Sequence, residues 1–227
     1  INSMRIKDME IQQRPREKAL RSGVKSLNDA ELAALLLSSG VKQRTVEQIA
    51  HDLVRKSENF SRLPKMTLEE LMEIEGIREA KAFQIQAALE LSMRAMRAQS
   101  YARPIHKPQD LVLWFEMEYG ILAQEHFVCV YLDTKGEIIT HKVLFKGSLN
   151  ESVIHPREIF REAFIHNANS IILVHNHPSN DVTPSPADLS TTSLLINVSK
   201  TMGIKITDHI IVGQNKYYSF KEHRALH

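Results

Sequence analysis

The chain has 227 residues, of which 43% are hydrophobic and 25% are charged, and its formal net charge is +2. This length suits one large domain or two small ones, and the sequence contains no apolar run near the ~20 residues needed to cross a bilayer. The single cysteine excludes a disulfide framework within one chain and a cysteine-rich structural zinc site. The N-terminal residues lack a basic segment followed by an apolar core, so we expect no secretory signal, no membrane partner and a cytoplasmic protein.

The first part of the chain is the more basic and is predicted to be helical. Residues 1–104 hold 18 Lys or Arg against 14 Asp or Glu, a net charge of +4, whereas residues 105–227 hold 11 against 13, a net charge of −2. Apolar residues recur at helical spacing over 29–37 and 46–54, and Gly or Ser residues flank both stretches. We therefore expect an all-helical domain at the start of the chain.

Residues 71–82 of this part are similar to a helix-hairpin-helix, a small DNA-binding unit. In that unit a tight turn with glycine presents backbone N–H groups at a helix N-terminus to a phosphate, without reading sequence. Here Gly76 is followed by Arg78 where a second glycine is usual, so the backbone approaches a phosphate less closely while the arginine charge partly substitutes. We expect weak, sequence-independent DNA binding near Gly76, Arg78 and Lys81; the alternative is a hairpin used for packing or for protein contact.

The stretch from Ala98 to Pro104, after the last helical pattern, has the composition of a linker. Beyond it the patterns of strands and helices mix. We therefore expect an α+β protein, with a small helical domain over residues 4–98, a linker over 99–107 and a mixed α/β domain over 108–226.

Two histidines in the second part follow a predicted strand. The apolar run 171–174 predicts a buried strand that ends at His175 and His177. Because alternate side chains of a strand share a face, both imidazoles can reach one ion while Asn176 points away. Such a pair is typical of a metal site at the end of a strand.

Ten residues separate His177 from a carboxylate, Asp188, at the start of a predicted helix. Ser185 stands where an N-cap belongs, Pro186 occupies the first helical position, and Asp188 lies in the first turn. Two imidazoles and one carboxylate suit zinc, and three protein ligands leave a fourth position open for water, as in catalytic zinc sites. The alternative is that Ser185 and Asp188 only begin a helix, as an ordinary capping pair.

The spacing His-x-His, seven residues, Ser, two residues, Asp resembles the pattern of JAMM metalloproteases, and its surroundings resemble the bacterial RadC family over nearly the whole chain. The segments that carry the second resemblance are 14–18, 156–158 and 208–213. The resemblance implies a JAB/MPN-like, cytidine-deaminase-like zinc hydrolase domain after the helical one. It implies that His175, His177 and Asp188 hold Zn²⁺.

The resemblance also implies two catalytic residues. The family places a glutamate at the start of the first core strand, here predicted over 127–132, which makes Glu125 the matching position. One carboxylate can take a proton from the zinc-bound water and pass it to the leaving nitrogen. Glu158 is the competing carboxylate, but it lies in a predicted helix with charged faces. Ser185 would donate a hydrogen bond to the oxygen that becomes negative, a role that competes with capping.

Two classes of function remain open from the sequence. The first is a zinc-dependent hydrolase that cleaves an amide bond in a protein or peptide substrate, as a peptidase or isopeptidase. The alternative is a DNA-binding or DNA-repair accessory protein in which the metal site is ancillary. Of the remaining histidines, His209 beside Asp208 matches part of the RadC pattern, which implies that it lines the site or orients a ligand; the alternative is a structural histidine. The others are expected at the surface or satisfied: His155, His166 and His223.

Overall fold

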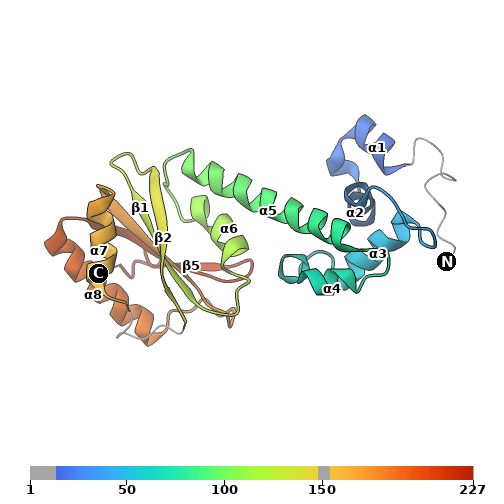
Figure 1. Ribbon diagram of the computed structural model, residues 1–227. Helices are drawn as coiled ribbons and strands as arrows, with labels where there is room; N and C mark the ends of the chain where they lie inside the picture. The colour runs from blue at the N-terminus through green and yellow to red at the C-terminus, as the bar shows by residue number, and fades with distance from the viewer. Residues whose placement is uncertain (1–13, 148–153, 227) are drawn as a thin grey trace. The chain divides into compact units, whose positions relative to one another are not determined.

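The computed structural model describes residues 14–147 and 154–226. The chain forms two compact units, Ile1–Ser92 and Met93–His227, drawn in Figure 1. The first is helical and the second combines a mixed sheet with helices, so the predicted α+β class is confirmed. Among the helices of the described residues, none is both long and apolar enough to span a membrane.

The first unit is built from short helices around one apolar core. Its helical elements are α1 (Pro15–Ser22), η3 (Val24–Ser26), α2 (Asp29–Leu37), α3 (Val46–Lys56), η4 (Leu63–Lys65), α4 (Leu68–Met72) and the beginning of α5 (Glu79–Tyr101). Capping boxes begin α2, α3 and α4, with Asn28, Thr45 and Thr67 as N-caps. The core side chains come from all three helices and from α5, and they include Leu37, Ile49, Leu53, Leu71 and Ile85.

The second unit is a five-stranded sheet with helices on both faces. Its elements are α6 (Gln109–Glu118), β1 (His126–Leu132), β2 (Ile138–Lys146), α7 (Pro156–Ile165), β3 (Ser170–Asn176), α8 (Pro186–Met202), β4 (Lys205–Val212) and β5 (Tyr217–Ser219). The strand order is β2-β1-β3-β4-β5. Only β3 and β4 run parallel; the other neighbouring pairs are antiparallel.

Alternation along the strands divides the core of this unit into two layers. Phe127, Cys129 and Leu173 belong to the layer with α7 and α8, whereas Val128 and Val174 belong to the layer with α6. Figure 1 shows α7 and α8 together on one side of the sheet. Every residue of β1 and β3 is buried, so these central strands form a rigid support for whatever lies at their ends.

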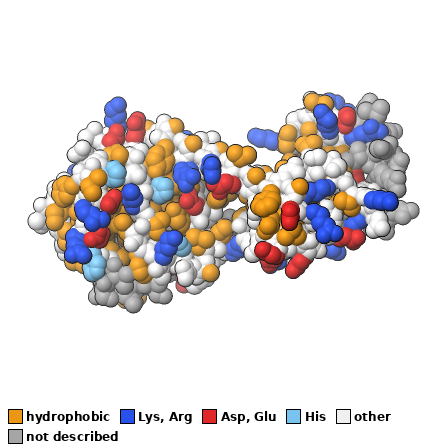
Figure 2. All heavy atoms as spheres, in the orientation of Figure 1, with side chains coloured by type: hydrophobic (Ala, Val, Ile, Leu, Met, Phe, Trp, Pro, Cys, Tyr) orange, Lys and Arg blue, Asp and Glu red, His pale blue; other side chains and the backbone are white. Residues whose placement is uncertain are grey.

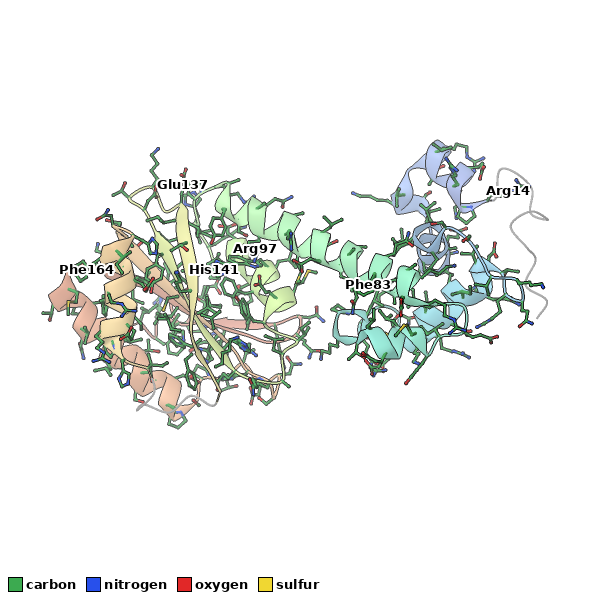
Figure 3. The ribbon with its side chains drawn as sticks, in the orientation of Figure 1. Arg14, Phe83, Arg97, Glu137, His141 and Phe164 are labelled. Carbon is green, nitrogen blue, oxygen red and sulfur yellow. The ribbon has the colours of Figure 1, made fainter. Side chains whose placement is uncertain are left out.

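The first three residues of the predicted linker over 99–107 are helical, because α5 continues to Tyr101. No Gly or Pro interrupts the helical pattern before Pro104. The last turns of α5 belong to the second unit: Arg97 pairs with Glu118 at 3.5 Å, and the Tyr101 hydroxyl lies 2.6 Å from His141 Nδ1. Arg97 and His141 are labelled in Figure 3. The unit boundary falls inside α5, earlier than the predicted domain end at residue 98.

Candidate metal centre

Four side chains with metal-binding atoms gather at one end of the sheet. Glu125, His175, His177 and Asp188 each bring one nitrogen or carboxylate oxygen, and these atoms all lie within 4.8 Å of one another. Glu125 precedes β1, the histidines lie at the end of β3, and Asp188 lies in the first turn of α8. The structure thus brings the three residues predicted as ligands together with the glutamate predicted as the proton carrier.

Asn176, between the two histidines, holds the chain on both sides of Glu125. Its side-chain oxygen accepts a hydrogen bond from the His126 backbone N–H at 2.7 Å, and its amide nitrogen donates to the Gln124 carbonyl at 3.0 Å. Asn176 points away from the histidines, as expected from strand alternation, but its contacts on both sides of Glu125 were not predicted. The consequence is that the strand carrying the histidines also fixes the backbone of the glutamate.

The two oxygens of Asp188 have different surroundings. Asp188 Oδ2 accepts hydrogen bonds from the backbone N–H and the hydroxyl of Ser185, each at 2.7 Å, within the predicted capping box. Asp188 Oδ1 is buried and has no hydrogen-bond partner among the described residues, although it lies 3.1 Å from His175 Nε2. A buried carboxylate oxygen without a donor is costly. A cation in front of it would remove that cost.

The imidazole nitrogens complete a set of atoms suited to a metal ion. His177 Nδ1 lies 2.6 Å from the Asp181 carbonyl, which can only accept, so Nδ1 carries the proton and Nε2 of the neutral ring presents its lone pair. His175 Nε2 lies 3.0 Å from His177 Nε2. Two imidazole nitrogens and one carboxylate oxygen are ordinary ligands of zinc and other first-row divalent metals. The residues present therefore fit such an ion.

The charges of the centre depend on one another. Burial would raise the pKa of Asp188, but contacts with the imidazoles of His175 and His177 outweigh burial and hold this pKa below its ordinary value. Burial would lower the pKa of His177, but the Asp188 carboxylate and the Asp181 carbonyl together raise it above its ordinary value. The Asp188 carboxylate and the His177 imidazole therefore each favour the charged form of the other.

Glu125 lies slightly farther from the imidazoles than Asp188 does. Its Oε1 is 3.8 Å from His175 Nε2 and 3.9 Å from His177 Nε2, and its side chain is 13% exposed. The competing carboxylate, Glu158, instead pairs with Arg161 at 2.9 Å on α7 and is not part of the group.

Comparison with known proteins agrees with this geometry. A family model described as RadC-like JAB domain matches residues 105–225, and one described as UPF0758 N-terminal matches residues 6–83. A UPF0758 protein of Geobacillus sp. (strain WCH70) is 45% identical over 218 residues, which are 96% of each chain. A UPF0758 protein of Bacillus cereus (strain B4264) is 43% identical over 218 residues, which are 96% of this chain and 97% of the relative. The chain belongs to the RadC (UPF0758) family.

The RadC-like JAB domain is a metallohydrolase-type domain, and the four gathered side chains lie within the residues that match it. Of the predicted Asp208–His209 pair, only His209 reaches the centre: its Nε2 lies 2.9 Å from His175 Nδ1. Complete burial holds the pKa of His209 well below its ordinary value. Asp208 points elsewhere and accepts a hydrogen bond from the Ser219 hydroxyl at 2.7 Å.

Two other histidines of the RadC-like domain have partners that sequence spacing did not show. His166 Nε2 lies 3.6 Å from Glu162 on α7. The ring of His223 stacks on Tyr218 with a centroid distance of 4.1 Å, and its Nδ1 lies 2.9 Å from the Ser219 carbonyl. Both are satisfied residues away from the metal-type group.

In the UPF0758 N-terminal part, the predicted hairpin joins α4 to α5. Gly76 has φ +97°, in the left-handed region that favours glycine, and the Ile77 N–H donates to the Ile74 carbonyl at 2.9 Å. Arg78 is exposed. Lys81 is partly buried, which lowers its pKa, and its ammonium donates to the Ser39 carbonyl. Lys81 therefore joins the hairpin to the loop after α2.

Proposed function

We propose that this protein is a zinc-dependent hydrolase of amide bonds, of the peptidase or isopeptidase type. The observation that carries the proposal is the buried Asp188 Oδ1, which has no hydrogen-bond partner in the described part of the chain. It lies beside two imidazole nitrogens, with the Glu125 carboxylate within 4.8 Å of them. Nitrogen ligands favour zinc over magnesium or calcium, which take oxygen ligands. His175, His177 and Asp188 would hold the ion. When bound there, zinc supplies a Lewis acid that polarises a carbonyl and lowers the pKa of water.

Glu125 moves the proton in this proposal. Its carboxylate accepts a proton from the attacking water as the new C–O bond forms at the substrate carbonyl. The same proton then passes to the amide nitrogen as the C–N bond breaks, so that water is added across the bond and an acid and an amine are released. One carboxylate serves as base and then as acid, and its backbone is held for this task by Asn176.

We assign Ser185 as the donor to the substrate carbonyl oxygen. Its hydroxyl donates to Asp188 Oδ2 at 2.7 Å, so the O–H must turn toward the substrate as negative charge develops. The Ser185 backbone N–H, also at 2.7 Å from Oδ2, keeps Asp188 in place during that change. A donor of this kind is typically worth roughly 3 kcal/mol in the transition state.

The experiment that tests the proposal is release of free amine from a library of fluorogenic peptide amides and lysine-linked isopeptides by the zinc-loaded full chain. Glu125→Gln should keep the metal and the fold but lose at least ~10²–10⁴-fold in rate, because the amide side chain cannot accept the proton. Glu158→Gln is the matched control and should turn over as the parent does. Equal loss in both variants, or full activity in Glu125→Gln, would contradict the role of Glu125.

A second candidate function concerns the helical unit, for which we propose weak DNA binding at the hairpin between α4 and α5. Two observations favour it: the left-handed turn at Gly76, which leads directly into α5, and the exposure of Arg78 beside it. On the face shown in Figure 2, basic and acidic side chains are interspersed over this unit. Binding by a few phosphate contacts suits that distribution better than binding by a broad basic stripe.

A further inference from the structure

A chain of buried hydrogen bonds links two residues of the candidate metal centre through two side chains outside it. His175 Nδ1 lies 2.9 Å from His209 Nε2, and His209 Nδ1 lies 2.6 Å from Thr192 Oγ1. The Thr192 hydroxyl in turn lies 2.5 Å from the backbone carbonyl of Asp188. Thr192 and His209 are 2% and 0% exposed, so no bulk water competes for these bonds.

The position of each proton in this series of hydrogen bonds can be assigned from its Asp188 end. The Asp188 carbonyl can only accept, so the single hydroxyl proton of Thr192 lies between these two groups. Thr192 Oγ1 must then accept from His209, whose Nδ1 therefore carries its proton. A second ring proton would make His209, which is 0% exposed, a buried cation between a hydroxyl and another imidazole, so its Nε2 instead accepts from His175 Nδ1.

The hydrogen bond between His175 and His209 determines which nitrogen of His175 has a free lone pair. Because the proton of His175 is held on Nδ1, its Nε2 is unprotonated and faces His177 Nε2 at 3.0 Å and Asp188 Oδ1 at 3.1 Å. The plane of the His209 ring is held as well, since it stacks on Phe220 with a centroid distance of 4.8 Å and an angle of 13°. The chain of bonds therefore sets both the tautomer and the orientation of His175.

We propose that Thr192 and His209 are positioning residues that prepare His175 Nε2 to bind a metal ion. The inference rests on the proposed function, because it assumes that the ion binds at this nitrogen. The hydrogen-bond series also connects two proposed ligands on separate elements. It begins on β3, passes through β4 and ends on the backbone of Asp188 in α8. Since the connecting ring is neutral, it orients His175 without adding a negative charge to the centre.

The tautomer can be read directly from the metal-free protein. On isotope-labelled full chain at mildly alkaline pH, above the ordinary pKa of histidine, the ring-nitrogen chemical shifts should show the protons of His175 and His209 on Nδ1. A proton on Nε2 of His175 would overturn the proposal. This measurement requires no metal, so it tests the series of hydrogen bonds even if the protein binds no zinc and the proposed function fails.

Metal affinity then tests whether the chain of bonds matters. Thr192→Val removes the hydroxyl while keeping the shape, and the zinc or cobalt dissociation constant should rise by ~10–100-fold, as for loss of an outer hydrogen-bond partner. Thr192→Ser should restore the parent affinity. The matched control is Thr191→Val, because Thr191 is 3% exposed on the same helix and its hydroxyl has no hydrogen-bond partner within residues 14–147 and 154–226. Equal affinities in Thr192→Val and Thr191→Val would overturn the proposal.

Discussion

At the scale of single residues, the centre depends on how Asp188 is shared between a helix cap and a metal ion. Oδ2 accepts from the Ser185 backbone N–H and hydroxyl, whereas Oδ1 has no hydrogen-bond partner among the described residues and lies 3.1 Å from His175 Nε2. The capping box, which on its own would only begin α8, therefore aims one carboxylate oxygen into the centre. The structural and the functional interpretations of this Ser-x-x-Asp pattern are compatible.

We predict that Ser185→Ala lowers both stability and turnover. Loss of the N-cap hydroxyl should reduce the free energy of unfolding by roughly 0.5–2 kcal/mol, measured by denaturant titration. Loss of the donor to the substrate oxygen should reduce kcat by about 10²–10³-fold. Ser185→Thr keeps the hydroxyl and should retain most of both properties. The control is Ser190→Ala, whose hydroxyl donates to the Ala187 carbonyl within the same helix at 3.1 Å; a similar loss of kcat there would contradict a specific role for Ser185.

The pKa shifts predict how the stability of the metal-free protein varies with pH. The pKa of His177 is raised in the folded chain, so its contribution is fully present below 6.5, the ordinary value, and is lost as pH rises through the raised pKa. The pKa of Asp188 is lowered, so its contribution is present above 3.8 and is lost as pH falls through the lowered pKa. Both contributions are present together between these two ordinary values.

Thermal unfolding of the chelator-treated chain should therefore separate the parent from His177→Gln most strongly within that window. The difference in Tm should shrink as pH rises past the raised pKa of His177, since the parent then loses its proton as well. A difference that keeps growing toward alkaline pH in the absence of metal would contradict this account. With zinc present the trend should reverse, because protons compete with the ion for the imidazoles.

At the scale of elements, the hairpin between α4 and α5 is where the two candidate functions separate. If it binds DNA, affinity for a duplex oligonucleotide should be weak, indifferent to sequence and much lower at about 200 mM than at about 50 mM salt. Arg78→Glu should weaken binding further and reduce the salt slope by about one. Lys25→Glu is the control, since Lys25 is also exposed but lies in η3.

Two further measurements test DNA binding at the hairpin between α4 and α5. Arg78→Gly separates two contributions: tighter binding would mean that the backbone approach at Gly76 limits affinity, and weaker binding would mean that the arginine charge matters more. No affinity at about 50 mM salt would leave the hairpin as a contact module. Lys81→Glu is a poor probe, because it would also break the bond between Lys81 and the Ser39 carbonyl.

At the scale of the whole molecule, the features that could be predicted from sequence are those determined by residues close together in the chain. The start of α8 at Pro186, after the Ser185 cap, and the buried strand before His175 followed from nearby residues. Glu125 was identified only by resemblance, because it lies fifty residues from His175 and reaches it through strand pairing, which places Phe127 opposite His175.

Contacts that depend on tertiary packing could not be predicted in the same way. The contact between His209 and His175 requires the parallel register in which Leu173 pairs with His209, and Thr192 meets them only because α8 packs on this face of the sheet. The continuation of α5 to Tyr101 was missed for a related reason. Its last turns gain contacts with β2 and α6 of the second unit, which the sequence pattern does not display.

The proposed zinc site is tested most directly by the metal content of the full chain purified without chelator. We predict one zinc per chain in the parent, and loss of stoichiometric zinc in His177→Ala and in Asp188→Asn, because each change removes a ligand. His166→Ala, whose side chain lies beside Glu162 on α7, should keep the full content. Absence of stoichiometric metal from the parent, or undiminished zinc in His177→Ala, would contradict the account.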